Sequence, residues 1–115
     1  MNIKPEYYKE LDEEFKIKYR KYVRVDPDNR SYNLFTENEQ IERHARNVAF
    51  WQKEMNEARC KLNFSDGKAC ARTFMTSNNY STMVDLVKHK FNQTDQKTIM
   101  DRVKQLLDEE SPKTT

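Results

Sequence analysis

The sequence is poor in the residues that interrupt regular structure, with one glycine and three prolines among 115 residues. This scarcity indicates helix along most of the chain. It also excludes a glycine-rich loop, in which backbone N–H groups bind phosphate. We therefore expect an all-α protein of extended shape, with a single domain over residues 1–115.

Long apolar runs are also missing, since the longest, Val-Ala-Phe-Trp at residues 48–51, has four residues. A membrane-spanning helix needs about 20 apolar residues. The first 24 residues contain neither the apolar core of a secretory signal nor an Arg-rich, acid-poor transit peptide. We expect a protein without a transmembrane span, either soluble or peripheral to a membrane.

Neither sign of charge dominates, because 21 basic and 19 acidic side chains are interleaved and leave a net charge of +2. A nucleic-acid-binding surface needs basic residues clustered on one face. The best candidate, the basic run from Lys16 to Arg24, directly follows acidic residues from Glu10 to Glu14. We expect no nucleic-acid partner.

Metal ligands and catalytic groups are scarce as well. His44 and His89 are expected on different helices, far in sequence from Cys60 and Cys70. The paired Cys and His spacings of a zinc site are missing, and no local signature of a Cys–His nucleophile surrounds either thiol. We expect no metal, no cofactor, no small-molecule substrate and no enzymatic activity.

What the chain does have is apolar periodicity. A first helix is predicted over residues 6–23, where apolar residues recur at spacings of three and four: Tyr8, Leu11, Phe15, Tyr19 and Tyr22. A long central helix is predicted over residues 30–64, where they recur every seven residues: Leu34, Ile41, Val48, Met55 and Leu62. A capping-box pattern from Thr36 to Glu39 leaves its start open between about Asp26 and Thr36.

Three shorter helices are predicted after the long one, over residues 68–77, 82–91 and 95–109. The polar stretch at 76–81 is interpreted as a break between the first two, with Ser81 as a cap. Thr94 or Asp95 is expected to cap the last helix. Residues 110–115 are expected to form a frayed tail.

The two cysteines flank the only glycine of the chain, with nine residues between them. Cys60 and Cys70 are expected on two antiparallel helices near their connecting turn, where Gly67 suits a left-handed cap of the long helix. This spacing favours a helical hairpin closed by a Cys60–Cys70 disulfide. The alternative is a pair of free thiols in a reducing cytosol.

Apolar anchors stand in a charged background, since 36% of the residues are hydrophobic and 35% are charged. So small an apolar share favours helices that pack on each other or on a partner. Aromatic and methionine residues are favoured at the centres of protein interfaces. The candidate partner-binding residues are Tyr7, Tyr8, Phe50, Trp51 and Met55, and the alternative for the aromatic ones is an ordinary intramolecular core.

Residues 26–80 have a distinctive layout: Pro27, then a long charged helix with Trp51, then Cys60, a short Gly-containing loop and Cys70. This layout resembles the PDSW-type accessory subunit of mitochondrial respiratory complex I. The resemblance implies a non-catalytic structural subunit that docks on other subunits of the complex. It also implies a peripheral position on the intermembrane-space side of the inner mitochondrial membrane, an oxidising compartment.

A second resemblance concerns the stretches EEFKIKYRKYVR and RSYNLFTENEQIERHARN. They are similar to the propeptide-inhibitor domain of papain-like cysteine proteases, and the residues that fit are Phe15, Tyr19, Lys21, Phe35, Asn38 and Ile41. This resemblance implies an inhibitor whose Asn63–Gly67 segment lies in the protease cleft. A helical adaptor in the cytoplasm is a third hypothesis.

Overall fold

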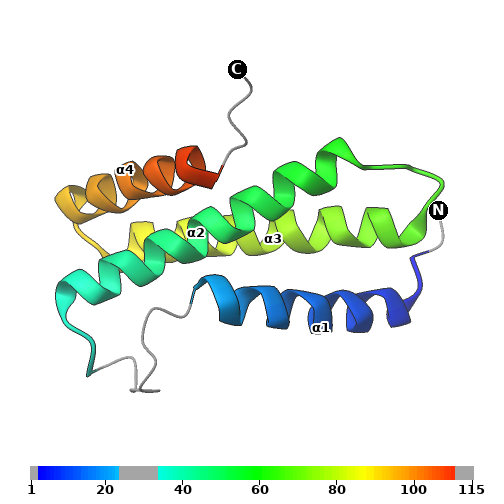
Figure 1. The fold of residues 1–115 in the computed structure, drawn as a ribbon, viewed down its shortest axis with the longest axis horizontal. Coiled ribbons are helices and arrows are strands. Elements are labelled where there is room, and N and C mark those ends of the chain that lie inside the picture. Colours follow the sequence, from blue (N-terminus) through cyan, green and yellow to red (C-terminus); the bar gives the residue numbers. More distant parts are fainter. Residues whose placement is uncertain (1–2, 24–33, 111–115) are drawn as a thin grey trace.

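The computed structural model describes residues 3–23 and 34–110, which form four α-helices (Figure 1). The helices are α1 (Pro5–Tyr22), α2 (Glu37–Cys60), α3 (Gly67–Lys90) and α4 (Gln93–Glu110). The all-α prediction is confirmed. Residues 30–33 of the predicted long helix and residues 111–115 of the predicted tail lie outside the described residues.

Helix α1 begins at a proline. Pro5 stands in the first turn, where its missing N–H removes no intrahelical hydrogen bond. The helix ends after Tyr22, and the N–H of Val23 still donates to the carbonyl of Tyr19 at 2.8 Å. The predicted range of 6–23 is therefore one residue late at each end.

Helix α2 begins at the predicted capping box. The N–H of Glu39 donates to Oγ1 of Thr36, and the N–H of Thr36 donates to Oε1 of Glu39, each at 3.2 Å. Two N–H groups that the helix itself leaves unpaired are satisfied in this way. The start that the sequence left open is thus fixed after Thr36. Since α2 ends at Cys60, the predicted helix of 30–64 is too long.

Residues 61–66 turn the chain between α2 and α3. Oδ1 of Asn63 accepts hydrogen bonds from the N–H and the hydroxyl of Ser65, at 3.0 and 2.7 Å. Asp66 then caps α3, because its Oδ1 accepts from two backbone N–H groups of the first turn at 2.9 and 3.3 Å. Gly67 is consequently the first residue of α3, and its predicted role as a left-handed cap of α2 is wrong.

Helix α3 runs unbroken through residues 76–81, so the two predicted helices of 68–77 and 82–91 are one. Its threonines bond within the helix. The hydroxyls of Thr73, Thr76 and Thr82 donate to the carbonyl one turn earlier, at 3.1, 2.8 and 2.9 Å.

Helix α4 begins two residues before its predicted start. The side chain of Asn92 accepts a hydrogen bond from the N–H of Asp95 at 2.8 Å, so Asn92 caps the helix in place of Thr94 or Asp95.

Consecutive helices run antiparallel, and α2 lies at the centre of the bundle (Figure 1). It packs mainly against α3 and α4, while α1 lies chiefly along α3. The molecule measures 45 × 38 × 26 Å, with a radius of gyration of 15.5 Å. A compact domain of this length has a radius of about 13 Å, so the bundle is somewhat extended.

Two apolar clusters lie on different sides of α2. One joins α2 to α3 and α4 through Ala45, Val48, Ala49, Val87, Ile99, Val103 and Leu106. The other joins α1 to α2 and α3 through Leu11, Phe15, Val23, Phe50, Trp51 and Ala71. In the second cluster Trp51 meets Phe15 and Phe50 edge-on, with ring centroids 5.2 and 4.8 Å apart.

Candidate functional site

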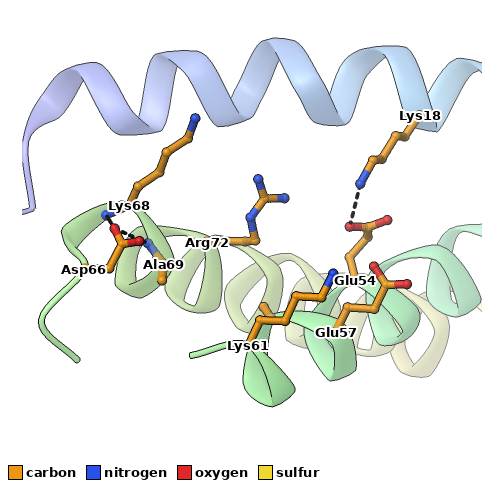
Figure 2. Close-up of a pocket in the computed structure, with 9 residues that line it drawn as sticks. Lys18, Glu54, Glu57, Lys61, Asp66, Lys68, Ala69 and Arg72 are labelled. Atoms are coloured by element: carbon orange, nitrogen blue, oxygen red, sulfur yellow. Dashed lines mark hydrogen bonds and ion pairs between the residues drawn. The ribbon is translucent and has the colours of Figure 1, made fainter. Parts of the chain in front are cut away.

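A hollow of about 430 Å³ opens where α1, the end of α2 and the start of α3 meet (Figure 2). Charged residues line it almost throughout: Lys18, Glu54, Glu57, Lys61, Asp66, Lys68 and Arg72, with Ala58 and Ala69 between them. A second hollow of about 300 Å³ lies next to it, since both are lined by Lys18, Glu54 and Glu57. Together the two hollows form one trough, which we call the α1–α2 trough.

An ion pair crosses the trough from α1 to α2. Nζ of Lys18 lies 3.3 Å from Oε2 of Glu54, and Figure 2 shows the lysine reaching toward the carboxylate. The Glu54 side chain is only 8% exposed, whereas that of Lys18 is 47% exposed. Because a buried carboxylate needs a partner, this contact ties the middle of α1 to α2.

A second set of ion pairs closes the other edge of the trough, between α1 and α3. Nη2 of Arg72 lies 2.6 Å from Oε2 of Glu14, and Nζ of Lys68 lies 3.1 Å from Glu10 and 3.5 Å from Glu14. The hydrogen bond from Arg72, followed by the nearby charges, lowers the pKa of Glu14. The hydrogen bond to Glu10 raises the pKa of Lys68.

The second hollow follows the C-terminal half of α1. It is lined by Lys18, Lys21, Tyr22, Phe50, Lys53, Glu54 and Glu57. Its walls therefore join lysine and glutamate side chains to two aromatic rings. Such a surface can bind a charged and partly apolar segment of another molecule.

Three of the five predicted partner-binding residues belong to the core. Phe50, Trp51 and Met55 are 4%, 8% and 7% exposed, so the prediction that they dock on a partner is wrong. Tyr7 is half-buried against the cluster between α1, α2 and α3, and Tyr8 is exposed. Of the five, only Tyr8 is an exposed anchor.

The predicted Cys60–Cys70 disulfide is absent, since both cysteines are free thiols. Cys60 is exposed at the last residue of α2, and Cys70 is buried in the first turns of α3. The Cys70 sulfur instead lies 3.9 and 3.8 Å from the carbonyl oxygens of Asn63 and Phe64. The turn is held by its own side-chain caps rather than by a covalent bond.

His44 and His89 have different surroundings. His44 is buried and its ring meets Phe91 edge-on at 5.0 Å. Burial, followed by the charges of Lys90 and Arg43, lowers the pKa of His44 to about 4. His89 is exposed. Within residues 3–23 and 34–110, no three His, Cys, Asp or Glu side chains gather in a way that could hold a metal ion.

The sequence-based predictions missed two exposed aromatic residues, Phe64 and Phe74, which are 72% and 58% exposed. Phe64 lies in the α2–α3 turn and Phe74 two turns into α3. Phe64 could have been identified as exposed from its place in the turn, because a turn residue does not belong to the apolar face of a helix. No sequence pattern indicates the trough, because its residues come from three separate helices and from the α2–α3 turn.

Comparison of the chain with known protein families, curated proteins and solved structures finds no significant match. None of the described helices is both long enough and apolar enough to cross a lipid bilayer.

Proposed function

We propose that this protein is a non-catalytic subunit that docks on other proteins of a larger assembly. The exposure of Phe64 and Phe74 near one end of the α2–α3 hairpin carries this proposal. Large aromatic side chains are enriched at the centres of protein interfaces, where covering them removes apolar surface from water. Phe50, Trp51 and Met55 are occupied in the core, so the docking anchors are the exposed rings.

A double substitution tests this docking surface. Phe64→Ser with Phe74→Ser removes both rings at exposed positions, where their loss should change the stability of the fold little. Ile17→Ser is the matched control, since Ile17 is 57% exposed on α1. We expect the tagged wild type and the control to migrate with a large assembly on a native gel, and the double variant to migrate alone. A wild type that migrates alone contradicts the proposal.

Respiratory complex I is the assembly that we propose first. The support is the layout of residues 26–80, which resembles the PDSW-type accessory subunit. Because Cys60 and Cys70 are free thiols, no disulfide supports an intermembrane-space location. This location therefore rests on the resemblance alone. Blue-native electrophoresis of mitochondrial membranes from the source cells tests it, and recovery of the protein only in the cytosol contradicts it.

Inhibition of a papain-like protease is the second candidate, favoured by the antiparallel contact of α1 with α2. In that contact Tyr19 meets Phe50 edge-on at 5.8 Å. The Asn63–Gly67 segment is a hydrogen-bonded turn leading directly into α3, whereas a cleft-binding segment is extended. An assay with papain separates the two functions: inhibition at nanomolar concentration supports the inhibitor, and full protease activity contradicts it.

A further inference from the structure

Basic side chains outnumber acidic ones in the lining of the α1–α2 trough. Its lining contains six basic side chains, Lys18, Lys21, Lys53, Lys61, Lys68 and Arg72, against three acidic ones, Glu54, Glu57 and Asp66. The lining thus has a net charge of +3, whereas the whole chain has +2. Glu10 and Glu14 of α1, which pair with Lys68 and Arg72 at the edge of the trough, reduce the net charge there to +1.

Several of these charged side chains form ion pairs or hydrogen bonds within the fold. Lys18 pairs with Glu54, while Lys68 and Arg72 pair with carboxylates of α1. The Asp66 carboxylate accepts backbone hydrogen bonds at the start of α3. These groups shape the trough and leave little attraction for a ligand.

Two exposed lysines remain. Lys21 lies in the last turn of α1, at the second hollow, and Lys61 follows the end of α2, at the first hollow. Neither makes an ion pair with another residue in the part of the chain that the structure describes. Lys21 therefore marks the second hollow and Lys61 the first, and the Lys18–Glu54 ion pair lines both hollows.

The side chains that line the trough between these lysines favour an acidic protein segment over a nucleic acid. Glu54 and Glu57 line both hollows, so a nucleic-acid strand, with a charge at every phosphate, would place some phosphates against carboxylates. A protein segment can space its acidic residues to avoid them. It can also place an apolar side chain against the half-buried ring of Tyr22 in the second hollow.

We propose that the α1–α2 trough binds an acidic, partly apolar segment of a partner protein, with Lys21 and Lys61 as the main contacts for its carboxylates. The inference deepens the proposed function and rests on it, because it assigns a chemistry to the partner within the larger assembly. The Phe64 side chain belongs to the turn between Lys61 and Asp66, so one partner can cover the exposed ring and enter the trough.

A peptide titration tests the trough on the full chain. The probe is a fluorescein-labelled amphipathic peptide of glutamate and leucine, followed by fluorescence anisotropy. Lys21→Glu with Lys61→Glu is the test variant. Lys97→Glu with Lys104→Glu is the matched control, because it makes the same change in charge at exposed positions of α4. Far-UV circular dichroism verifies that both variants remain helical.

We expect the test variant to bind the peptide at least about tenfold more weakly than the control variant, since two attractive contacts become repulsive. Affinity should also fall with added salt. An equal loss in both variants overturns the proposal. So does equal affinity for a peptide with glutamine in place of glutamate, or tighter binding of a single-stranded oligonucleotide of the same length.

Migration on a native gel separates this inference from the proposed function. If the wild type joins an assembly and the Lys21→Glu, Lys61→Glu variant joins it equally well, the trough is not the docking site and the proposed function stands. If the wild type joins no assembly, the proposed function fails. The peptide titration then still decides whether the trough binds acidic segments.

Discussion

Phe15 on α1 and Trp51 on α2 meet edge-on with ring centroids 5.2 Å apart, and this contact is the centre of the apolar cluster that holds α1 to the bundle. Trp51 is the only tryptophan of the chain, so its fluorescence reports on the attachment of α1.

Truncation of the Phe15 ring should therefore loosen α1. We expect Phe15→Ala to lower the free energy of unfolding by about 3–5 kcal/mol, because it leaves a cavity beside Trp51. Urea unfolding followed by Trp51 emission measures the loss. Ile17→Ala, on the exposed side of the same helix, should change stability by less than about 0.5 kcal/mol. Equal losses in the two variants would contradict the assigned packing.

Glu42 ties α2 to α4. Its carboxylate accepts hydrogen bonds from Nε and Nη2 of Arg102 at 2.9 and 3.1 Å, and from Nε of Arg46 at 3.0 Å. The hydrogen bond from Arg102 is the main cause of the lowered pKa of Glu42. A carboxyl whose pKa is lower in the folded state stabilises the protein above its ordinary pKa. That stabilisation is lost as pH falls below about 4.5 and through the lowered value.

We accordingly expect Glu42→Gln to cost about 1–2 kcal/mol of unfolding free energy at pH 7. The difference from the wild type should shrink as pH falls below 4.5 and through the lowered pKa, because the carboxyl then becomes protonated in the folded state as well. Urea titrations at several pH values measure it. Glu13→Gln, at an exposed position with no ion pair to another described residue, provides the control and should show no such pH dependence.

His44 should produce a separate pH dependence at milder acidity. Its folded pKa of about 4 lies below the ordinary value of 6.5, so the unfolded chain binds the proton first as pH falls. The stabilising contribution of neutral His44 to the free energy of unfolding is present in full above about pH 6.5. It declines toward pH 4, by an amount of the order of 2–3 kcal/mol. We expect His44→Gln to abolish this decline in thermal unfolding, whereas His89→Gln, at an exposed position, should keep it.

The two thiols should differ sharply in accessibility. Cys60 is exposed and Cys70 is 3% exposed, so a disulfide reagent such as Ellman's should modify one thiol rapidly and the other only as the fold opens. In Cys60→Ser the fast phase should disappear, and in Cys70→Ser it should remain. A mass two protons lower under non-reducing conditions would instead show that the thiols are joined in the native protein.

A local pattern indicated the start of α2, although the caps of α3 and α4 by Asp66 and Asn92 were not predicted. The pattern is the capping box of Thr36 and Glu39, in which both hydrogen bonds join residues three apart. The apparent break at residues 76–81 failed for the converse reason. Polar residues there favour turns in isolation, but Thr76 is fully buried and its hydroxyl bonds within the helix.

The sequence patterns did not predict which residues of each helix are buried against the other helices. The seven-residue stripe of α2 included Leu34, which is 63% exposed and lies before the helix begins. It did not include the small residues Ala45 and Ala58, which are almost wholly buried. Since α2 packs against helices on more than one side, its buried face is wider than a single line of residues spaced seven apart. Phe50 and Trp51 became core residues for this reason, and the trough could not be anticipated.

The two apolar clusters on different sides of α2 share Tyr22, Tyr80 and Met83 as packing neighbours. A disturbance of either cluster thus reaches the other through residues that touch both. This sharing makes the bundle one cooperative unit in unfolding rather than two sub-bundles joined by α2. Trp51 emission and far-UV circular dichroism should consequently report a single, coincident transition, and α1 should not detach before α4.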